Sequence, residues 1–476
     1  MDNTKSPRSR HISEVLETGC LHVNSSPMKQ GIRVVMLFSL LCCAGSFTIS
    51  CQPKKTENAL PKLSDDSLFT LVQYRTFQYF WNGAEPTSGA ARERYHVDGD
   101  YPNNDKNIVT TGGTGFGVMA ILVGIERGFI TRKEGFDRLN KLTDWLAKAD
   151  RFHGAWPHWM NGETGKVKPF GANDNGGDLV ETAYLIQGLL CVRQYFLNGS
   201  PEENTLAAKI DTLWKGVEWD WYRHGNQDVL FWHWSPDKQW IMNFAIGGYN
   251  ECMITYLLAA GSPTHGIPAE VYHKGWARNG GIRNDKTHQQ YGLHLSLKHN
   301  GAEKFGGPLF WSHYSFLGLD PRNLKDEYAD YWQHNKNHVL IDYNYCVQNP
   351  KGYKGYGTNC WGLTAGYSIR GYAAHSPTED LGVITPTGAL SSFPYTPEES
   401  KAAMRYFYDS MGTKIFGKFG FYDGFSEQFN WHKPWYLAID QGPIVVMMEN
   451  YRTQLLWNLF MSAPEVKAAK TKLGFN

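Results

Sequence analysis

The sequence predicts an all-α fold, an (α/α)6 barrel or toroid with long loops rich in glycine and aromatic residues and only minor β structure. Two kinds of helical segment alternate along the chain: some are amphipathic, and others are apolar or small on nearly every side. A helix that is apolar all round is buried, so the alternation predicts an inner ring of helices inside an outer one. Roughly twelve candidate helices fit this arrangement, and the alternative, an irregular α-solenoid, would require a fixed-length repeat that the chain lacks.

The amphipathic segments begin at Ser64, after which apolar residues recur at helical spacing as far as Trp81. Later segments carry a start signal, a Ser or Thr followed three residues on by Glu, at Thr131, Ser200 and Thr396. In such a capping box the two side chains satisfy free backbone amides at the helix start. We therefore expect outer helices to begin at these positions.

The apolar segments each open with a glycine-rich polar turn. We expect buried helices at or after the turns at residues 111–117, 175–178, 247–251, 356–361 and 440–442. In a double ring these turns converge at one end and bring acids that are far apart in the sequence into a single cleft. Strand-like patterns are few, chiefly residues 383–385 and 418–422, and the segment from about 281 to 357 is expected to form functional loops.

The N-terminal region has the pattern of an export signal. Residues 28–50 combine a basic start with an apolar run that is shorter than a membrane span. The run ends directly before Cys51, as in a bacterial lipobox, so we expect residues 1–51 to be an extension with a lipoprotein signal and Cys51 to be lipidated. An ordinary cleavage site nearby is the alternative. We expect residues 52–63 to be a tether, residues 64–476 to be a single domain, and the protein to be exported to a bacterial envelope, in the periplasm or at the outer membrane.

Composition and charge argue against several classes of protein. A formal net charge of +1, without a basic run in the folded part, argues against nucleic-acid binding. The cysteines after Cys51 show no C-x-x-C spacing, and the His334–His338 pair has no adjacent acid, so we expect no metal and no cofactor. We expect a monomer whose only contact with the membrane is the lipid anchor.

Aromatic residues are abundant, with 17 Trp, and several lie in glycine- and proline-rich connecting segments. Exposed aromatic rings suit the apolar faces of sugars. Most Trp residues in any protein belong to the core, so we expect only a minority of these to bind a ligand.

Acidic residues gather at the predicted helix starts. Asp178 and Glu181 share one helical face, and Asp174 lies just before the first turn. Glu251 and Asp440 occupy similar positions in later segments. The apolar sequence that follows predicts burial, which raises the pKa of a carboxyl group. A simpler interpretation is that these acids only cap helices and complement the helix dipole.

Several carboxyl groups in one place suit glycoside hydrolysis. This reaction needs one carboxyl group to protonate the leaving oxygen and another to activate water or attack carbon. Glu251 is flanked by apolar sequence, so it should be partly desolvated and is the candidate general acid.

The motifs at residues 76–81, 89–94, 112–117, 174–181, 247–251, 308–314 and 440–452 together resemble the glucoamylase-like domain of glycoside hydrolase family 144. The resemblance covers about residues 64–465. It implies an (α/α)6 barrel that hydrolyses β-1,2-glucan or its oligosaccharides with inversion at the anomeric carbon. Some members of the family cut internally, and others release sophorose from a chain end.

The same resemblance places Asp174, Asp178, Glu181 and Glu251 in the family's acidic cleft, with Glu251 as the choice for proton donor. The base is left open among Asp174, Asp178 and Asp440. From loop placement and composition, the candidates for sugar-binding subsites are Trp156, His158, Trp159, Trp234, Trp311, His313 and Tyr314.

Two other classes of protein remain as alternatives. A non-catalytic glycan-binding lipoprotein would keep the aromatic residues but would have no reason to place acids at the starts of buried helices. A polysaccharide lyase on the same toroid would need Arg or Lys against uronates and a Tyr or His base. The neutral net charge and the clustered acids argue against the lyase.

Overall fold

Helices make up most of the regular structure in the described part of the chain, residues 60–476 of this computed structural model. Residues 62–476 form one compact unit. Within the described residues, no helix combines the length and the apolar character needed to cross a membrane. The predicted signal at residues 28–50, the lipidation residue Cys51 and most of the predicted tether lie outside the described residues.

The α-helices differ in how much of their surface is buried. Nearly every residue is buried in α3 (Thr111–Glu126), α5 (Leu179–Phe196), α7 (Met253–Gly261) and α13 (Ala438–Thr453). The other α-helices are α2 (Asp65–Trp81), α4 (Arg132–Leu146), α6 (Pro201–Lys215), α8 (Ala269–Val271), α9 (Tyr331–Gln348), α10 (Pro386–Leu390), α11 (Pro397–Asp409), α12 (Gly412–Ile415), α14 (Leu455–Ser462) and α15 (Pro464–Leu473). Short 3-10 or π turns are η1 (Pro102–Asn107), η2 (Trp221–Arg223), η3 (Tyr272–Trp276), η4 (Arg278–Gly280), η5 (Leu309–Ser312) and η6 (Tyr314–Phe316).

The strands are short and pair locally or across long stretches of sequence. They are β1 (Arg94–His96), β2 (Ile108–Thr110), β3 (Trp159–Asn161), β4 (Val167–Lys168), β5 (Gly177–Asp178), β6 (His233–Trp234), β7 (Ala365–Ser368), β8 (Gly371–Ala374), β9 (Phe416–Gly417), β10 (Gly420–Phe421), β11 (Phe425–Ser426), β12 (Trp431–His432) and β13 (Trp435–Leu437). The β2–β3–β4 sheet has three strands, and every other pairing joins two strands, all antiparallel.

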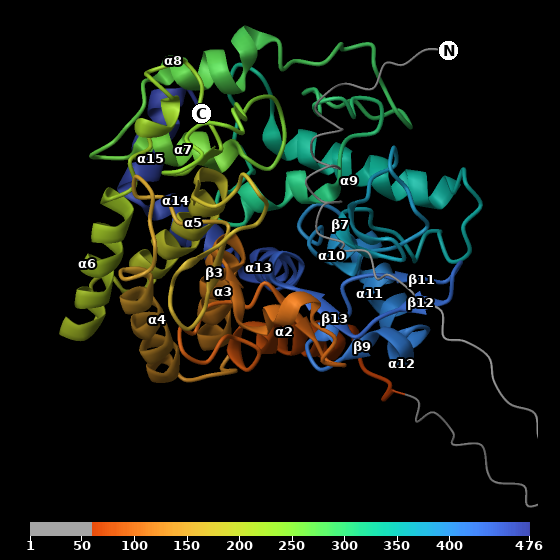
Figure 1. Cartoon of the computed structure of the whole chain (residues 1–476). Coiled ribbons are helices and arrows are strands. Elements are labelled where there is room, and N and C mark those ends of the chain that lie inside the picture. Colours follow the sequence, from red (N-terminus) through yellow and green to blue (C-terminus); the bar gives the residue numbers. More distant parts are fainter. Residues whose placement is uncertain (1–59) are drawn as a thin grey trace, which may run out of the picture. The chain divides into compact units, whose positions relative to one another are not determined.

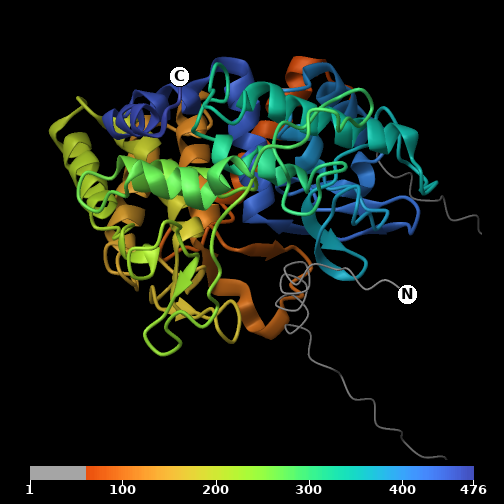
Figure 2. The same cartoon turned by 90° about the horizontal axis from the view of Figure 1, so that it is seen from above.

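The buried helices pack side by side, with amphipathic helices against them. α3 lies against α5 and α13, and α5 lies against α7. In Figure 1, α3 in orange and α13 in blue are neighbours although they come from opposite ends of the described chain. α2 covers α3 and α13, α6 covers α5, and α15 covers α7. Seen from above in Figure 2, the blue C-terminal helices lie beside segments from the first half of the chain.

Close approach of α3 and α5 depends on two glycines. A Cβ atom on Gly115 would lie 2.3 Å from the carbonyl oxygen of Tyr184, and one on Gly188 would lie 2.1 Å from the carbonyl oxygen of Gly115. Both distances are far below a van der Waals contact, so a larger side chain would force the helices apart. The glycines therefore let the two helices that present Gly112 and Glu181 to the site pack backbone against backbone.

The predicted helix starts are largely confirmed. Ser64 caps α2, and Thr131 and Ser200 form complete capping boxes with Glu134 and Glu203. The prediction at Thr396 is wrong in its chemistry. The helix α11 does begin there, but the Thr396 hydroxyl donates back to the Ser392 carbonyl at 3.3 Å instead of capping.

The expected buried helices appear at four of the five glycine-rich segments, as α3, α5, α7 and α13. Residues 175–178 and 247–251 precede their helices, whereas residues 111–117 and 440–442 lie inside α3 and α13, so the prediction of a turn is wrong there. The fifth prediction is wrong, since residues 356–361 form a turn closed by paired hydrogen bonds between Gly357 and Cys360. The expectation of loops over residues 281–357 is wrong for α9, whose polar residues are buried against neighbouring segments. A helix with a buried polar face has no apolar period in its sequence, which explains why the pattern concealed it.

Short strands hold the turns before the buried helices in place. β5, which leads into α5, pairs with β6, so that Asp178 lies opposite His233. β13, which leads into α13, pairs with β1. These pairings bring segments that are distant in the sequence to the starts of the buried helices.

Candidate active site

Asp178 is the N-cap of α5 and is completely buried. Its Oδ1 accepts hydrogen bonds from the amides of Val180 at 3.0 Å and Glu181 at 2.9 Å, and from the indole Nε1 of Trp232 at 2.8 Å. Its Oδ2 accepts from Nδ1 of His158 at 2.9 Å. These donors engage both oxygens of the carboxylate and fix Asp178 at the start of α5.

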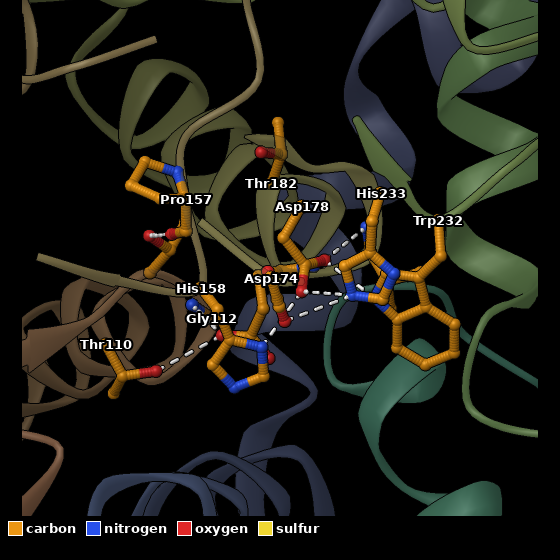
Figure 3. A network of polar contacts seen from close by, with 12 residues as sticks. Thr110, Gly112, Pro157, His158, Asp174, Asp178, Thr182, Trp232 and His233 are labelled. Atoms are coloured by element: carbon orange, nitrogen blue, oxygen red, sulfur yellow. Dashed lines mark hydrogen bonds and ion pairs between the residues drawn. The ribbon is translucent and has the colours of Figure 1, made fainter. Parts of the chain in front are cut away.

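Two histidines point at this carboxylate from different sides, as Figure 3 shows. Nε2 of His233 lies 3.6 Å from Oδ2 of Asp178 and 3.4 Å from Oδ2 of Asp174. Burial lowers the pKa of each histidine, but the surrounding carboxylates outweigh it and raise the pKa of His158 to about 9 and that of His233 to about 10. Burial works against ionisation of Asp178 too, yet the two histidines hold its pKa below the usual range. At neutral pH the site therefore contains two imidazolium cations.

Glu181 lies in the first turn of α5 and is 7 % exposed. Its Oε2 accepts a hydrogen bond from the amide of Gly112 at 2.7 Å, at the start of α3, and from the hydroxyl of Thr110 at 3.2 Å. Burial raises the pKa of Glu181, and the charge of Asp178 adds to that effect. The carboxyl group is thus fixed between the starts of two buried helices.

Glu251 is half-buried and precedes α7 by two residues rather than lying in its first turn. Its backbone carbonyl accepts hydrogen bonds from the hydroxyls of Ser315 at 2.5 Å and Tyr184 at 3.3 Å. Burial raises the pKa of its carboxyl group to about 7, and the nearby negative charges of Glu181 and Asp178 contribute to the increase. A carboxyl group that is half protonated near neutral pH is suited to act as a general acid.

Asp440 lies in the first turn of α13 and is 1 % exposed. Its carboxyl group contacts that of Asp423, which is 2 % exposed and lies between β10 and β11. Burial and the mutual repulsion raise the pKa of Asp440 well above the usual range. We refer to Asp423 and Asp440 as the carboxyl pair, and to Asp174, Asp178, Glu181 and Glu251 as the acidic cluster.

Tyrosines connect the carboxyl pair with the acidic cluster. Burial raises the pKa of Tyr314, and the charges of Asp440, Glu181 and Glu251 all add to this increase. Burial likewise raises the pKa of Tyr372, and the charges of Asp440, Asp423 and Glu181 add to the increase. Because acids of both groups raise the pKa of the same tyrosine, the carboxyl pair and the acidic cluster are electrostatically coupled and belong to one site.

One group of side chains in the described residues has ligand atoms close enough to suit a metal ion, namely His158, Asp174 and Asp178, whose ligand atoms lie within 4.8 Å of one another. The 2.9 Å between Nδ1 of His158 and Oδ2 of Asp178 is a hydrogen-bond distance. This contact fits a hydrogen bond from the His158 imidazolium to the Asp178 carboxylate.

The structure corrects two of the predicted sugar-binding residues. Trp156 is fully buried, and its indole Nε1 donates to the carbonyl of Leu146 at 3.1 Å. His313 is 1 % exposed and bonds through Nε2 to the Ser392 hydroxyl at 3.0 Å. Neither ring is available to a sugar, so both predictions are wrong, because a loop-like sequence context does not reveal burial by segments that are distant in the chain.

The other predicted binding residues have different surroundings. His158 lies within the acidic cluster, and its ring stacks on Phe170 with centroids 4.1 Å apart. Tyr314 is 5 % exposed but lies beside the acids. Three half-buried Trp rings complete the set: Trp159 packs on Phe170, Trp234 on Trp221 and His153, and Trp311 on His299. Sugar binding by these residues stays a prediction.

Sequence reasoning missed three side chains of this site. Trp232 and His233 lie in the aromatic segment 231–234, but only the pairing of β5 with β6 shows that they reach Asp178. Asp423 had no signal at all, since a single acid in a loop is ordinary. Its proximity to Asp440 arises from packing between the loop before β11 and the start of α13.

Buried carboxyl groups brought together from the starts of several helices, one with a pKa near neutrality, define the class of this protein: it is a glycoside hydrolase of the helix-rich type. Comparisons with known proteins agree. Residues 243–464 match the Glycoamylase family model, whose description is "Putative glucoamylase".

Several relatives have a named activity. An endo-beta-1,2-glucanase from Chitinophaga pinensis, solved with sophorotriose and glucose, is 67 % identical with a TM-score of 0.86, and the match covers 87 % of this chain and 99 % of that one. The exo beta-1,2-glucooligosaccharide sophorohydrolase of Parabacteroides distasonis is 46 % identical over 426 residues, which is 86 % of this chain. The chain spans only 58 % of the length of that curated relative.

A solved beta-1,2-glucanase from Parabacteroides distasonis has a TM-score of 0.81 at 45 % identity, covering 87 % of this chain and 60 % of that one. The extent of these similarities settles the family. The chain belongs to glycoside hydrolase family 144, the glucoamylase-like family.

Proposed function

We propose that the protein hydrolyses β-1,2-linked glucan by cutting within the chain. The observation that carries this proposal is the 67 % identity to an endo-beta-1,2-glucanase along 99 % of that relative's length. The relative named for release of sophorose is less similar and considerably longer than this chain. The buried carboxyl groups supply the acid and base that hydrolysis requires.

Glu251 acts as the general acid in this proposal. Its pKa of about 7 leaves it protonated up to neutral pH, and its half-buried position allows contact with a substrate. In the reaction its proton moves to the glycosidic oxygen as the bond to the anomeric carbon breaks. The imidazolium groups of His158 and His233 offset the negative charge of the neighbouring carboxylates.

For the base, we favour Asp440 among the three residues that the sequence left open. The Asp178 carboxylate is occupied by its donors, and Asp174 is engaged by His233. The Asp440 oxygens accept no hydrogen bond from an N–H or O–H group of the described residues. They are therefore free to receive a proton from the attacking water, which would arrive on the face opposite the leaving group and invert the anomeric carbon.

Product analysis tests the proposed activity. Purified enzyme is incubated with long linear β-1,2-glucan, and the early products are separated by size. We expect a ladder of oligosaccharides. Disaccharide as the sole product would mean exo action, and the absence of any product would refute the proposed hydrolysis of β-1,2-glucan. Proton NMR of the first product should show the α-anomer, and an initial β-anomer would contradict inversion.

A Glu251→Gln variant tests the acid. We expect it to lose about 10²- to 10⁴-fold in kcat on β-1,2-glucan, the usual contribution of a general acid. The exposed Glu270 offers a matched control, because Glu270→Gln makes the same chemical change away from the site. A β-1,2-linked substrate with a fluoride leaving group needs no protonation, so it should restore most of the rate in the Glu251 variant. Equal loss on both substrates would contradict the role of Glu251 as acid.

We propose further that the protein is an exported lipoprotein anchored through Cys51 and that its helices form six pairs, as an (α/α)6 barrel has. The lipobox-like sequence before Cys51 supports the anchor, and the alternation of buried and amphipathic helices supports the pairs. Expression of the full chain in a bacterial host with labelled palmitate tests the anchor. Label in the wild type that is absent from Cys51→Ala supports it, and equal label in both would refute it.

A further inference from the structure

The carboxyl pair has a chemical property that neither residue would have alone. Oδ2 of Asp423 accepts a hydrogen bond from the amide of Tyr367 at 2.5 Å, which fixes this carboxyl group against β7. Its Oδ1 and both oxygens of Asp440 are buried and receive no N–H or O–H donor from the described residues. No ion pair within residues 60–476 involves either aspartate. The two carboxyl groups nevertheless contact each other.

Two ionised carboxylates in contact would offer only acceptors to each other. A hydrogen bond between them requires one proton, because an O–H group must donate to the oxygen opposite. Burial without a cation makes the doubly ionised state costly. The geometry therefore fits a pair with one proton and a single negative charge.

The other titratable groups around the pair do not remove this cost. Asp440 faces Tyr314 from η6 and Tyr372 from β8, and both are neutral at ordinary pH because burial raises the pKa of each. Asp423 faces Tyr367 from β7 and the carboxylate of Glu93 before β1. Arg94, whose charge acts on Tyr367, is already paired with Glu93.

We propose that Asp423 and Asp440 share one proton throughout the working pH range and that Asp423 is a positioning residue, which donates or receives that proton and so keeps one negative charge available at Asp440. This inference rests on the proposed role of Asp440 as the base. Burial favours the neutral form of a lone Asp440, and a neutral carboxyl group cannot act as a base, whereas the pair keeps one negative charge.

The reaction balances with the pair as base. As the water oxygen bonds to the anomeric carbon, one water proton passes to the pair, which becomes neutral and holds two protons. The glycosidic oxygen meanwhile takes the proton of Glu251, so the two products carry the complete elements of water. Afterwards the pair releases one proton to solvent and Glu251 regains one.

Proton counting tests the shared proton without using activity. Unfolded carboxyl groups have pKa values of about 4, so above pH 7 a native pair with a proton binds one more proton than the unfolded chain. Stability then falls as pH rises, and the unfolding equilibrium constant increases about tenfold per pH unit for that proton. In Asp423→Asn the amide donates to an ionised Asp440, so the shared proton is gone. Measured by urea unfolding between pH 7 and 9, the unfolding equilibrium constant of this variant should rise less steeply than that of the wild type, by about a factor of ten per pH unit. Should Asp423→Asn not fold, Asp440→Asn removes the same proton.

Asp342 provides the control for proton counting. It is completely buried in α9, one of its carboxyl oxygens has no partner among the described residues, and burial raises its pKa well above the usual range. Asp342→Asn should therefore also reduce the pH dependence of unfolding, but it should leave the pH dependence of kcat/KM unchanged. A pH dependence of unfolding that is identical in wild type and Asp423→Asn would overturn the shared proton.

A pair of substitutions at residue 423 tests its effect on Asp440. Asp423→Asn keeps a donor toward Asp440, so the acidic limb of kcat/KM should stay within about half a pH unit of the wild type. Asp423→Ala leaves Asp440 buried and alone, so the acidic limb of kcat/KM should move at least one unit toward alkaline pH. Relative to the wild type, kcat/KM should then fall about tenfold more at pH 6 than at pH 8. Equal losses at every pH in both variants would mean a merely structural role and would overturn the positioning role. A proton count that changes in Asp423→Asn, together with an acidic limb that does not move in Asp423→Ala, would contradict Asp440 as the base and leave the shared proton intact.

Discussion

The raised pKa of Glu251 predicts that the enzyme loses activity as pH rises above neutrality. Glu251 must be protonated to donate to the leaving oxygen, so the active form is the neutral acid. Its pKa of about 7 means that half of the molecules lack the proton at pH 7. The group is thus expected to set the alkaline limb of kcat/KM.

The size of this effect follows from the surroundings of Glu251. The pKa rises from 4.5 to about 7, mainly through burial. This difference corresponds to about 3 kcal/mol between the two protonation states. The protonated fraction should be about a tenth at pH 8 and about a hundredth at pH 9, so kcat/KM should fall about tenfold per pH unit there.

The sign of the stability change is the same as for activity. Because folding raises the pKa of Glu251, the folded state holds a proton that the unfolded state has released, and stability declines as pH rises from about 4.5 through about 7. Above about pH 7 this stabilising contribution has been lost in full. Glu251→Gln should remove it, since glutamine does not titrate.

The assay is kcat/KM for a soluble β-1,2-gluco-oligosaccharide at half-unit steps from pH 5 to pH 9. Wild type and Glu270→Gln should share an alkaline limb near pH 7, and the residual activity of Glu251→Gln should lack it. The reasoning would be refuted by wild-type activity that is flat to pH 9, or by an unchanged limb in Glu251→Gln. Either result would place the titrating acid elsewhere.

Further predictions concern the residues around Asp178 and the helix contact beneath it. Asp178→Asn keeps an acceptor for the α5 cap but removes the charge between the histidines, so the pKa values of His158 and His233 should fall from about 9 and about 10 in NMR titrations. Their displacement should cost about 10²-fold in kcat/KM, and unshifted histidines would contradict the account. In the wild type the stability from these imidazolium groups is complete below about pH 6.5 and should be lost as pH rises through 9 to 10, as urea unfolding can measure. Gly188→Ala would place a methyl group 2.1 Å from the Gly115 carbonyl oxygen and should destabilise the protein by about 1 to 3 kcal/mol or more. Gly357→Ala, which meets no atom within 4 Å, should change stability by less than about 0.5 kcal/mol, and equal effects of the two substitutions in thermal unfolding would refute the packing argument.

Local patterns identified the helices whose burial follows from their own composition. α3 and α7 consist almost entirely of apolar and small residues, so their sequences alone predict a buried position. α9 was missed because its buried residues include His334, His338 and Asp342, which find partners only in distant segments. Burial of polar residues depends on those partners, and a period of apolar residues cannot reveal it.

The sequence likewise identified most acids of the candidate site but not their states. Asp178, Glu181, Glu251 and Asp440 stand beside glycine-rich turns, which marked them as candidates. The side chains that engage the Asp178 carboxylate belong to residues 158, 232 and 233, and only tertiary contacts bring them there. A pKa depends on charges within a few ångströms in space, so no pattern along the chain could rank these acids.

By itself the sequence determined the helix-rich fold, the presence of buried helices at four of the glycine-rich segments and the membership of a family whose acids could be named in advance. Those properties follow from local composition and from short motifs. Only the tertiary structure decided that Trp156 and His313 belong to the core, that His233 and Trp232 hold Asp178, and that Asp423 meets Asp440. Each of these outcomes depends on contacts between segments far apart in the chain, where burial removes water and leaves neighbouring side chains to set the charge.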